Sequence, residues 1–221
     1  MKRKDLFPTP VWTIDNCGVT DRDKMIEFCH HVKAEDPDGR KSSNLGGWQS
    51  WDFRPEVLKQ NAFKPLYDII MRWCYAAADD MGFQEYTLRM TNLWININKR
   101  GDYNVIHTHP GAVLSGVYYL SLPNCCSGDI TFQRDPKEQH LREFWGCSDN
   151  FDRWNEVIAD EYDMYPEEDK LIIFPAHLPH RVNQSASDGD RISISFNVTA
   201  FSNYYHEIYP TNQPNRTKLS L

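Results

Sequence analysis

The chain has 221 residues, of which 40% are hydrophobic and 13% aromatic, and its formal net charge at pH 7 is −7. This length and apolar content fit one globular domain with a sizeable core and exclude a disordered chain. The acidic balance, without any basic stripe, argues against nucleic acid as a partner. Because no apolar run is long enough for a signal peptide or a membrane span, we expect a cytoplasmic protein without membrane contact.

The first part of the chain, residues 1–85, is expected to form helices and loops. Apolar residues recur at helical spacing between positions 25 and 32, and Thr20 is the expected N-cap of that helix. A second helix is expected over 63–81, where the apolar residues lie on one stripe. Between them, the glycine- and tryptophan-rich segment 43–51 either covers a binding pocket or packs on the rest of the domain.

From residue 86 onward the hydrophobic period changes to two, which is typical of strands. Short strands separated by Gly, Pro and Asn predict a sandwich or barrel, so the expected fold class is mainly β with flanking helices. The charged and aromatic segment 134–168 is expected to be a long insertion, either a lid or a surface excursion. The single domain 1–221 would then comprise the N-terminal portion, a β core at 86–201 and a tail at 202–221. The expected strands are 87–98, a strand around 107, 113–122, 129–132, 170–174 and 191–200.

Histidines at two distant places in the chain are candidate metal ligands. His107 and His109 are two residues apart, so on an extended segment both imidazoles point to the same side, within reach of one ion. Imidazole suits iron, zinc, copper or nickel, although a lone pair of this kind also fits ordinary surface histidines. His180 follows the apolar strand 170–174 and is expected in a loop, where it could add a third imidazole; His177 is a lesser candidate.

The strand over 191–199 alternates strictly, with polar residues on one face and apolar residues on the other. The polar face either meets solvent or lines a barrel interior that holds a polar ligand. In the second case Arg191 would form a bidentate pair with a carboxylate, and Ser193 could donate to the same group. By the same strand-facing argument, Asn96 and Asn98 could line that cavity.

Taken together, these motifs resemble the 2-oxoglutarate/Fe(II)-dependent oxygenases and, more narrowly, a family of uncharacterised oxygenases from marine phages and bacteria. The resemblance implies a double-stranded β-helix core of the jelly-roll or cupin type, with the N-terminal helices packed on it. It also implies a phage-encoded or bacterial protein located in the bacterial or host cytoplasm. The matching segments are 6–12, 43–50, 104–111, 115–120, 174–180 and 191–197.

Carried over residue by residue, the resemblance implies a role for each matching side chain. His107 corresponds to the first iron-binding histidine and His180 to the distal one. Arg191, assisted by Ser193, corresponds to the residues that bind the far carboxylate of 2-oxoglutarate. Tyr119 lies where the more distantly similar prolyl hydroxylases have a tyrosine that binds the co-substrate.

The chain departs from the common pattern at one ligand. Most of the superfamily has Asp or Glu two residues after the first histidine, whereas this chain has His109. Three neutral imidazoles leave one more net positive charge at the metal than two imidazoles and a carboxylate. A carboxylate from elsewhere, such as Asp129 or Asp135, could complete the site instead, but the position of His109 favours the histidine.

The resemblance implies an enzyme that uses Fe(II), with 2-oxoglutarate as co-substrate and O2, and that hydroxylates a peptide or small-molecule substrate with release of succinate and CO2. One alternative is a cupin-like three-histidine metalloenzyme, a dioxygenase or a zinc enzyme, that does not use 2-oxoglutarate. Another is a non-catalytic β-barrel binding protein. The sequence leaves the oligomeric state open; a homodimer is one possible assembly, since dimers are the commonest outcome for soluble domains of this size.

Overall fold

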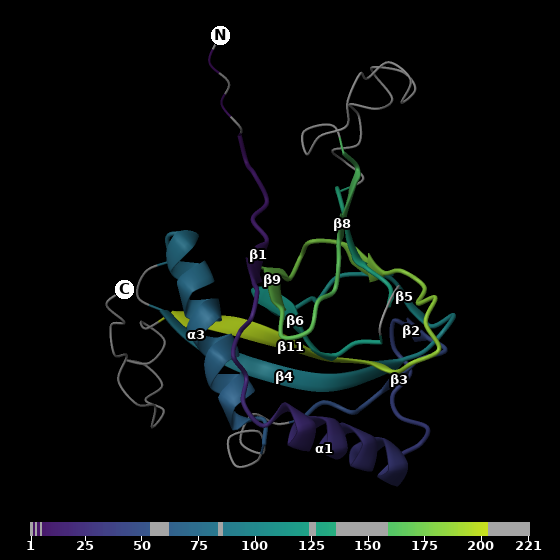
Figure 1. The fold of residues 1–221 in the computed structure, drawn as a ribbon. Coiled ribbons are helices and arrows are strands. Elements are labelled where there is room, and N and C mark those ends of the chain that lie inside the picture. Colours follow the sequence, from purple (N-terminus) through teal and green to yellow (C-terminus); the bar gives the residue numbers. More distant parts are fainter. Residues whose placement is uncertain are drawn as a thin grey trace, which may run out of the picture.

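The computed structural model describes residues 2, 4, 6–53, 62–83, 86–123, 127–135 and 159–202. These residues form two antiparallel β-sheets that face each other, with two helices on the outer side of the larger sheet (Figure 1). In the described part of the chain, no helix is long and apolar enough to cross a lipid bilayer.

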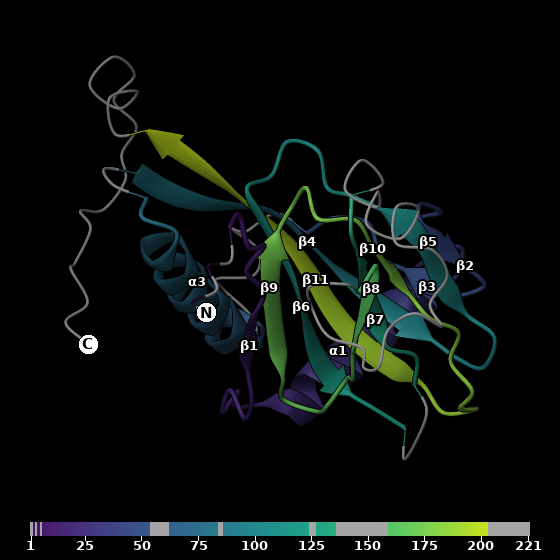
Figure 2. The ribbon, with the colours of Figure 1, turned by 90° about the horizontal axis from the view of Figure 1, so that it is seen from above.

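Among the described residues the larger sheet has six strands and the smaller sheet has five. Neighbouring strands within each sheet are antiparallel, and Figure 2 shows the two sheets from above. Strands that are distant in sequence alternate in each sheet, which is the arrangement of a double-stranded β-helix, a form of jelly roll. In spatial order the larger sheet contains β1 (Trp12–Ile14), β9 (Leu171–Pro175), β6 (Leu114–Ser121), β11 (Arg191–Ser202), β4 (Tyr86–Asn98) and β3 (Trp48–Gln49). The smaller sheet contains β2 (Asn44–Leu45), β5 (Tyr103–His107), β10 (His180–Val182), β7 (Ile130–Gln133) and β8 (Glu161–Met164).

The two faces of the larger sheet have different surroundings because side chains alternate along each strand. The outward side chains of β4 and β11, such as Ile95 and Phe196, join the main hydrophobic core together with the helices α1 (Arg22–Glu35) and α3 (Lys64–Asp80). The inward side chains face the smaller sheet. There, a second apolar cluster lies between the sheets; its buried members are Val117, Tyr119, Ile130, Phe132, Ile172 and Phe174.

The long periodic elements occur where the sequence predicts them. The helix expected over 63–81 is α3, and the six expected strands correspond to β4, β5, β6, β7, β9 and β11. The expected N-cap at Thr20 is wrong, because α1 begins one residue later and its N-cap is Asp21. Asp21 has a φ of 58° and makes no side-chain cap hydrogen bond. Aspartate is one of the few residues that tolerate this left-handed conformation.

Short strands occur where the sequence predicts only loops. The first 85 residues contain β1, β2 and β3 besides the helices, and the segment 134–168 contains β8. Strands of two to four residues are too short to show an alternating pattern, so only their pairing with longer strands defines them. Most of the expected insertion, residues 136–158, and the tail 203–221 lie outside the described residues.

Candidate metal centre

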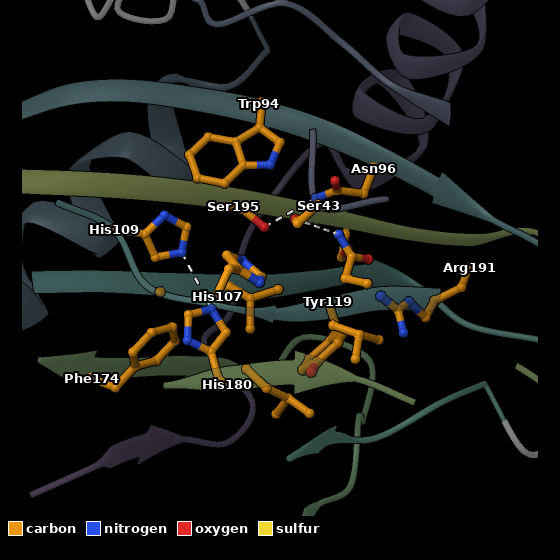
Figure 3. A pocket seen from close by; sticks show the side chains of 16 residues that line it. Ser43, Trp94, Asn96, His107, His109, Tyr119, Phe174, His180, Arg191 and Ser195 are labelled. Carbon is orange, nitrogen blue, oxygen red and sulfur yellow. Dashed lines mark hydrogen bonds between the residues drawn. The ribbon is translucent and has the colours of Figure 1, made fainter. Parts of the chain in front are cut away.

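Three imidazoles meet at one end of the smaller sheet. His107 is the last residue of β5, His109 lies two residues beyond it, and His180 is the first residue of β10. Because β10 pairs with β5 in a register that places His180 opposite His107, two histidines 73 positions apart become direct neighbours. One ring nitrogen from each of the three lies within 4.8 Å of the others, and the rings point toward one another (Figure 3).

The hydrogen bonds of the outer ring nitrogens orient two of these imidazoles. The Nδ1 atom of His107 lies 2.7 Å from the carbonyl oxygen of Val105, and the Nδ1 atom of His180 lies 2.9 Å from that of Leu178. Since a carbonyl only accepts, Nδ1 carries the proton in both rings, and the Nε2 lone pair is free for a metal. The Nε2 atoms of His109 and His180 are 3.3 Å apart, as expected for two ligands of one ion.

Burial keeps the three imidazoles uncharged at neutral pH. It lowers the pKa of His109 to about 4 and that of His180 to about 3, and repulsion between the neighbouring rings contributes in the same direction. Burial also lowers the pKa of His107. A metal ion binds the neutral form of histidine, so this environment prepares the cluster for a cation.

A cavity extends from the three histidines between the two sheets. Its wall on the larger sheet is the inward face of β4, β6 and β11, which supplies Asn96, Tyr119, Ser193 and Ser195. Figure 3 shows Tyr119 between the histidines and Arg191, which closes the far end of the cavity.

Arg191 is a buried cation without a carboxylate partner among the described residues. Arg191 is only 3% exposed, and this burial lowers the pKa of its guanidinium. It donates to the carbonyl oxygens of Ser127 and Gly128 at 3.1 and 3.0 Å, and at 3.5 Å to Oδ1 of Asn98. The Nε atom is buried and makes no hydrogen bond in the described structure. Burying an unpaired charge is costly, so the site favours an anion at this end of the cavity.

The structure brings together most of the predicted site residues. The three histidines form one cluster, and Tyr119, Asn96, Ser193 and Arg191 line the adjoining cavity. Asn98 has a different place: it does not line the cavity but lies opposite Arg191 on the neighbouring strand and accepts its hydrogen bond.

Other candidates lie away from the cluster. His177 is exposed, and His180 begins a strand rather than lying in the expected loop. Within the described residues the group of potential metal ligands contains His109 and neither Asp129 nor Asp135.

Sequence reasoning did not assign Trp94 to the site. This indole lines the cavity and lies beside His109, with 5.7 Å between the ring centroids. The alternation along its strand could have predicted this position, because Trp94 shares the inward face of the strand with Asn96. Ser43 is a second missed residue, and no periodic pattern marks it.

Residues 92–197 match the sequence model of the family described as "Putative 2OG-Fe(II) oxygenase". This segment is just under half of the chain and contains the three histidines and Arg191. No curated protein matches the sequence.

Solved structures share the fold at low sequence identity. The non-heme alpha ketoglutarate dependent epimerase SnoN from nogalamycin biosynthesis has a TM-score of 0.61 at 13% identity, covering 96% of this chain and 91% of that chain. A prolyl hydroxylase from Trichoplax adhaerens, in complex with a hypoxia inducible factor oxygen degradation domain peptide fragment, has a TM-score of 0.56 at 15% identity, with coverages of 91% and 87%. A Pseudomonas putida prolyl-4-hydroxylase has a TM-score of 0.54 at 14% identity, with coverages of 86% and 92%. The segment that carries the three histidines and Arg191 is thus similar to a family of 2OG-Fe(II) oxygenases, and the fold of the chain is that of the double-stranded β-helix structures named above.

Proposed function

We propose that this protein is an Fe(II)- and 2-oxoglutarate-dependent dioxygenase whose metal is held by His107, His109 and His180. The observation that carries the proposal is the pairing of two features in one cavity: three neutral imidazoles at one end and the unpaired, buried guanidinium of Arg191 at the other. A dicarboxylate complements both ends, since one end can meet the metal and the other the guanidinium.

Each end of the cavity has residues that hold its binding groups in place. The backbone carbonyls of Val105 and Leu178 fix the rings of His107 and His180. Asn98 and the carbonyls of Ser127 and Gly128 direct the guanidinium of Arg191. Because these partners belong to the protein itself, they can hold the binding groups in the orientation that the ligand needs.

The polar wall between the two ends supplies further hydrogen-bond donors. We assign the hydroxyls of Tyr119 and Ser193 to the 2-oxoglutarate carboxylate that Arg191 binds, and the amide of Asn96 to the same chamber. Phe174, Val117 and Ile130 belong to the apolar part of the lining, which disfavours water. When bound, Fe(II), 2-oxoglutarate and O2 supply the oxidising chemistry, in which one oxygen atom enters the substrate and the co-substrate leaves as succinate and CO2.

One observation favours a second candidate, a three-histidine metalloenzyme that does not use 2-oxoglutarate. The ligand cluster in the described structure contains three imidazoles and no carboxylate, a set that also suits zinc. That candidate gives no task to the buried, unpaired Arg191, and for this reason we rank it second.

The test is an anaerobic titration of the Fe(II)-loaded protein with 2-oxoglutarate, followed by visible absorption. We expect a charge-transfer band that saturates at one equivalent, because the keto acid would bind the metal directly. Titration with succinate, which lacks the keto group, is the control and should give no such band. If Fe(II) binds but 2-oxoglutarate produces neither a band nor heat of binding, the proposal fails and the second candidate stands.

We also propose a peptide or small molecule as the substrate. A phage or bacterial origin, a cytoplasmic location, a single domain and a homodimer stay predictions from the sequence. A sedimentation measurement would check the homodimer, and fractionation of the source cells would check the location.

A further inference from the structure

A second cavity adjoins the first at the proposed metal centre. The two cavities share Ser43, Trp94, His107 and His109. The second extends away from Arg191 along the same face of the larger sheet, toward Asn92 on β4 and Asn197 on β11. Along β11 the inward face therefore runs from the buried cation, past two serines, to a carboxamide beyond the histidines.

We propose that this second cavity binds the primary substrate through an uncharged amide group, such as a peptide unit or a carboxamide. The inference rests on the proposed function, because it places the substrate beside a metal centre whose other side holds 2-oxoglutarate. It names the chemical class that the chamber selects, and three features of the lining support it.

The first feature is a group of three carboxamides on three adjacent strands. Asn197 lies opposite Asn92 in the pairing of β11 with β4, and Gln49 of β3 lies opposite Asn96 of β4. The neighbour of Gln49, Trp48, packs in the main hydrophobic core on the helix side, so alternation turns Gln49 to the cavity side. The three carboxamides thus come from consecutive strands of one sheet and face one space.

The second feature is hydrogen-bonding capacity that the protein itself does not use. Gln49 is only 5% exposed, yet its side chain makes no hydrogen bond to the described residues. Trp94 is 9% exposed, and its indole N–H likewise has no acceptor among the described residues. Asn92 and Asn197 use their Oδ1 atoms, which accept from Thr91 and Ser115, and keep their amide hydrogens available. These donors and acceptors belong to residues that line the chamber, so they are available to a bound polar partner.

The third feature is the charge of the lining. Apart from the histidines, its charged side chains are Arg40 and Asp52, which form an ion pair with each other at 3.0 Å. The chamber thus offers no unpaired charge, in contrast to the Arg191 end of the first cavity. A carboxamide can donate to a carbonyl and accept from an N–H at once, which matches an amide better than an ion. The geometry therefore favours an uncharged amide over a charged ligand.

The test is a titration followed by the indole N–H resonances of the ¹⁵N-labelled full chain, loaded with Zn(II) as a diamagnetic ion, with and without 2-oxoglutarate. The spectrum of Trp94→Phe assigns the resonance of Trp94. The probes are uncharged amino acids blocked as N-acetyl, C-methylamide derivatives, compared with the same amino acids in their free, zwitterionic form. We expect at least one blocked derivative to shift the Trp94 resonance, and the free amino acids to have weaker effects.

Variants identify the groups that bind the probe. Gln49→Met should weaken the binding of that derivative about tenfold, the effect of losing a buried hydrogen-bonding group. Gln184→Met, which changes an exposed glutamine outside the cavity, should leave it unchanged. Asn92→Leu is a second test at a less buried position, should Gln49→Met lower the melting temperature. Arg191→Met should weaken 2-oxoglutarate binding by roughly 10- to 100-fold and leave the probe titration intact.

The outcomes separate this inference from the proposed function. If no blocked derivative shifts the Trp94 resonance, or if the free amino acids bind as tightly, the amide chamber is wrong even when 2-oxoglutarate binds. Equal binding by wild type, Gln49→Met and Asn92→Leu would also overturn it. If the derivatives bind but 2-oxoglutarate does not, the chamber stands and the assigned co-substrate is wrong.

Discussion

The inward face of β4 and β11 has two ends that differ in how their polar groups are satisfied. At one end the buried guanidinium of Arg191 donates hydrogen bonds to two backbone carbonyls and to Asn98. It forms no ion pair with a carboxylate in the described structure. At the other end Asn92, Asn197 and Gln49 are neutral, and the nearest charges are paired as Arg40 with Asp52. A fixed, unpaired cation suits one constant anionic ligand, whereas neutral amides suit a partner read by hydrogen bonds.

The proposed metal centre lies between these two ends, so removal of a ligand should affect both and produce the largest effect. His180→Ala removes the most buried imidazole and leaves two. We expect metal affinity to fall by at least about 100-fold, because even the loss of groups that only orient ligands costs 10–100-fold. Metal content after dialysis and turnover should both be lost. His177→Ala is the control, since this exposed histidine lies outside the cluster, and it should retain metal.

The next largest effect concerns the Arg191 end alone. Arg191→Met should weaken 2-oxoglutarate binding by roughly 10- to 100-fold, as expected when a charged hydrogen bond is lost, with metal content unchanged. Calorimetry under anaerobic conditions measures both quantities. The free protein should become no less stable to urea, because the variant removes a buried charge without a carboxylate partner.

Arg181→Met is the matched control for this prediction. Arg181 is paired with Glu161 on the smaller sheet and does not line either cavity, so 2-oxoglutarate affinity should not change. An equal loss in both variants would show that the effect of Arg191 is a general consequence of lost charge.

A smaller effect should appear as a pH dependence of the metal-free protein. The pKa values of His109 and His180 in the folded state are about 4 and about 3, below the ordinary value of 6.5. The unfolded chain therefore binds protons first as the pH falls. Stability is full above about pH 6.5 and declines below it, by up to about 1.4 kcal/mol per pH unit for each such imidazole.

Urea unfolding at several pH values measures this decline. His180→Gln should make the pH dependence shallower between pH 6.5 and 4, because one of the buried bases is gone. A stability that rises on acidification over this range would contradict the burial of neutral imidazoles.

The smallest expected effect is that of Asn98→Ala. Asn98 accepts a hydrogen bond from Arg191 but does not line either cavity. Its hydrogen bond to the guanidinium is long, at 3.5 Å, so we expect 2-oxoglutarate affinity to fall only about 2- to 5-fold. Steady-state kinetics should show the change in the KM for 2-oxoglutarate and not in kcat. A change in kcat with an unaltered KM would place Asn98 in another role.

The sequence predicts the long elements of this fold. For the candidate site, it predicts the common direction of His107 and His109 but not the position of His180 beside them. The period of α3, β4 and β11 is visible over a dozen residues or more, and the spacing of His107 and His109 gives their common direction once the segment is extended. His180 is different: its place beside His107 depends on the pairing of β10 with β5, which no local pattern contains.

The residues that line the two cavities also divide into those that a local pattern predicts and those that depend on strand pairing. Alternation along β4 and β11 identifies the polar face that carries Asn96, Ser193 and Arg191. It does not reveal that Asn98 lies beneath the guanidinium rather than in the cavity, because this depends on cross-strand register. Gln49 belongs to a strand of two residues, so its inward position follows only from pairing with β4.

The central claim is that one cavity holds a metal at three histidines and 2-oxoglutarate between that metal and Arg191. An anaerobic crystal structure with Fe(II) and 2-oxoglutarate tests it most directly. We predict iron bound by His107, His109 and His180, with the far carboxylate of 2-oxoglutarate on the guanidinium of Arg191. Iron ligated by a carboxylate side chain in place of His109, or 2-oxoglutarate bound away from Arg191, would contradict the account.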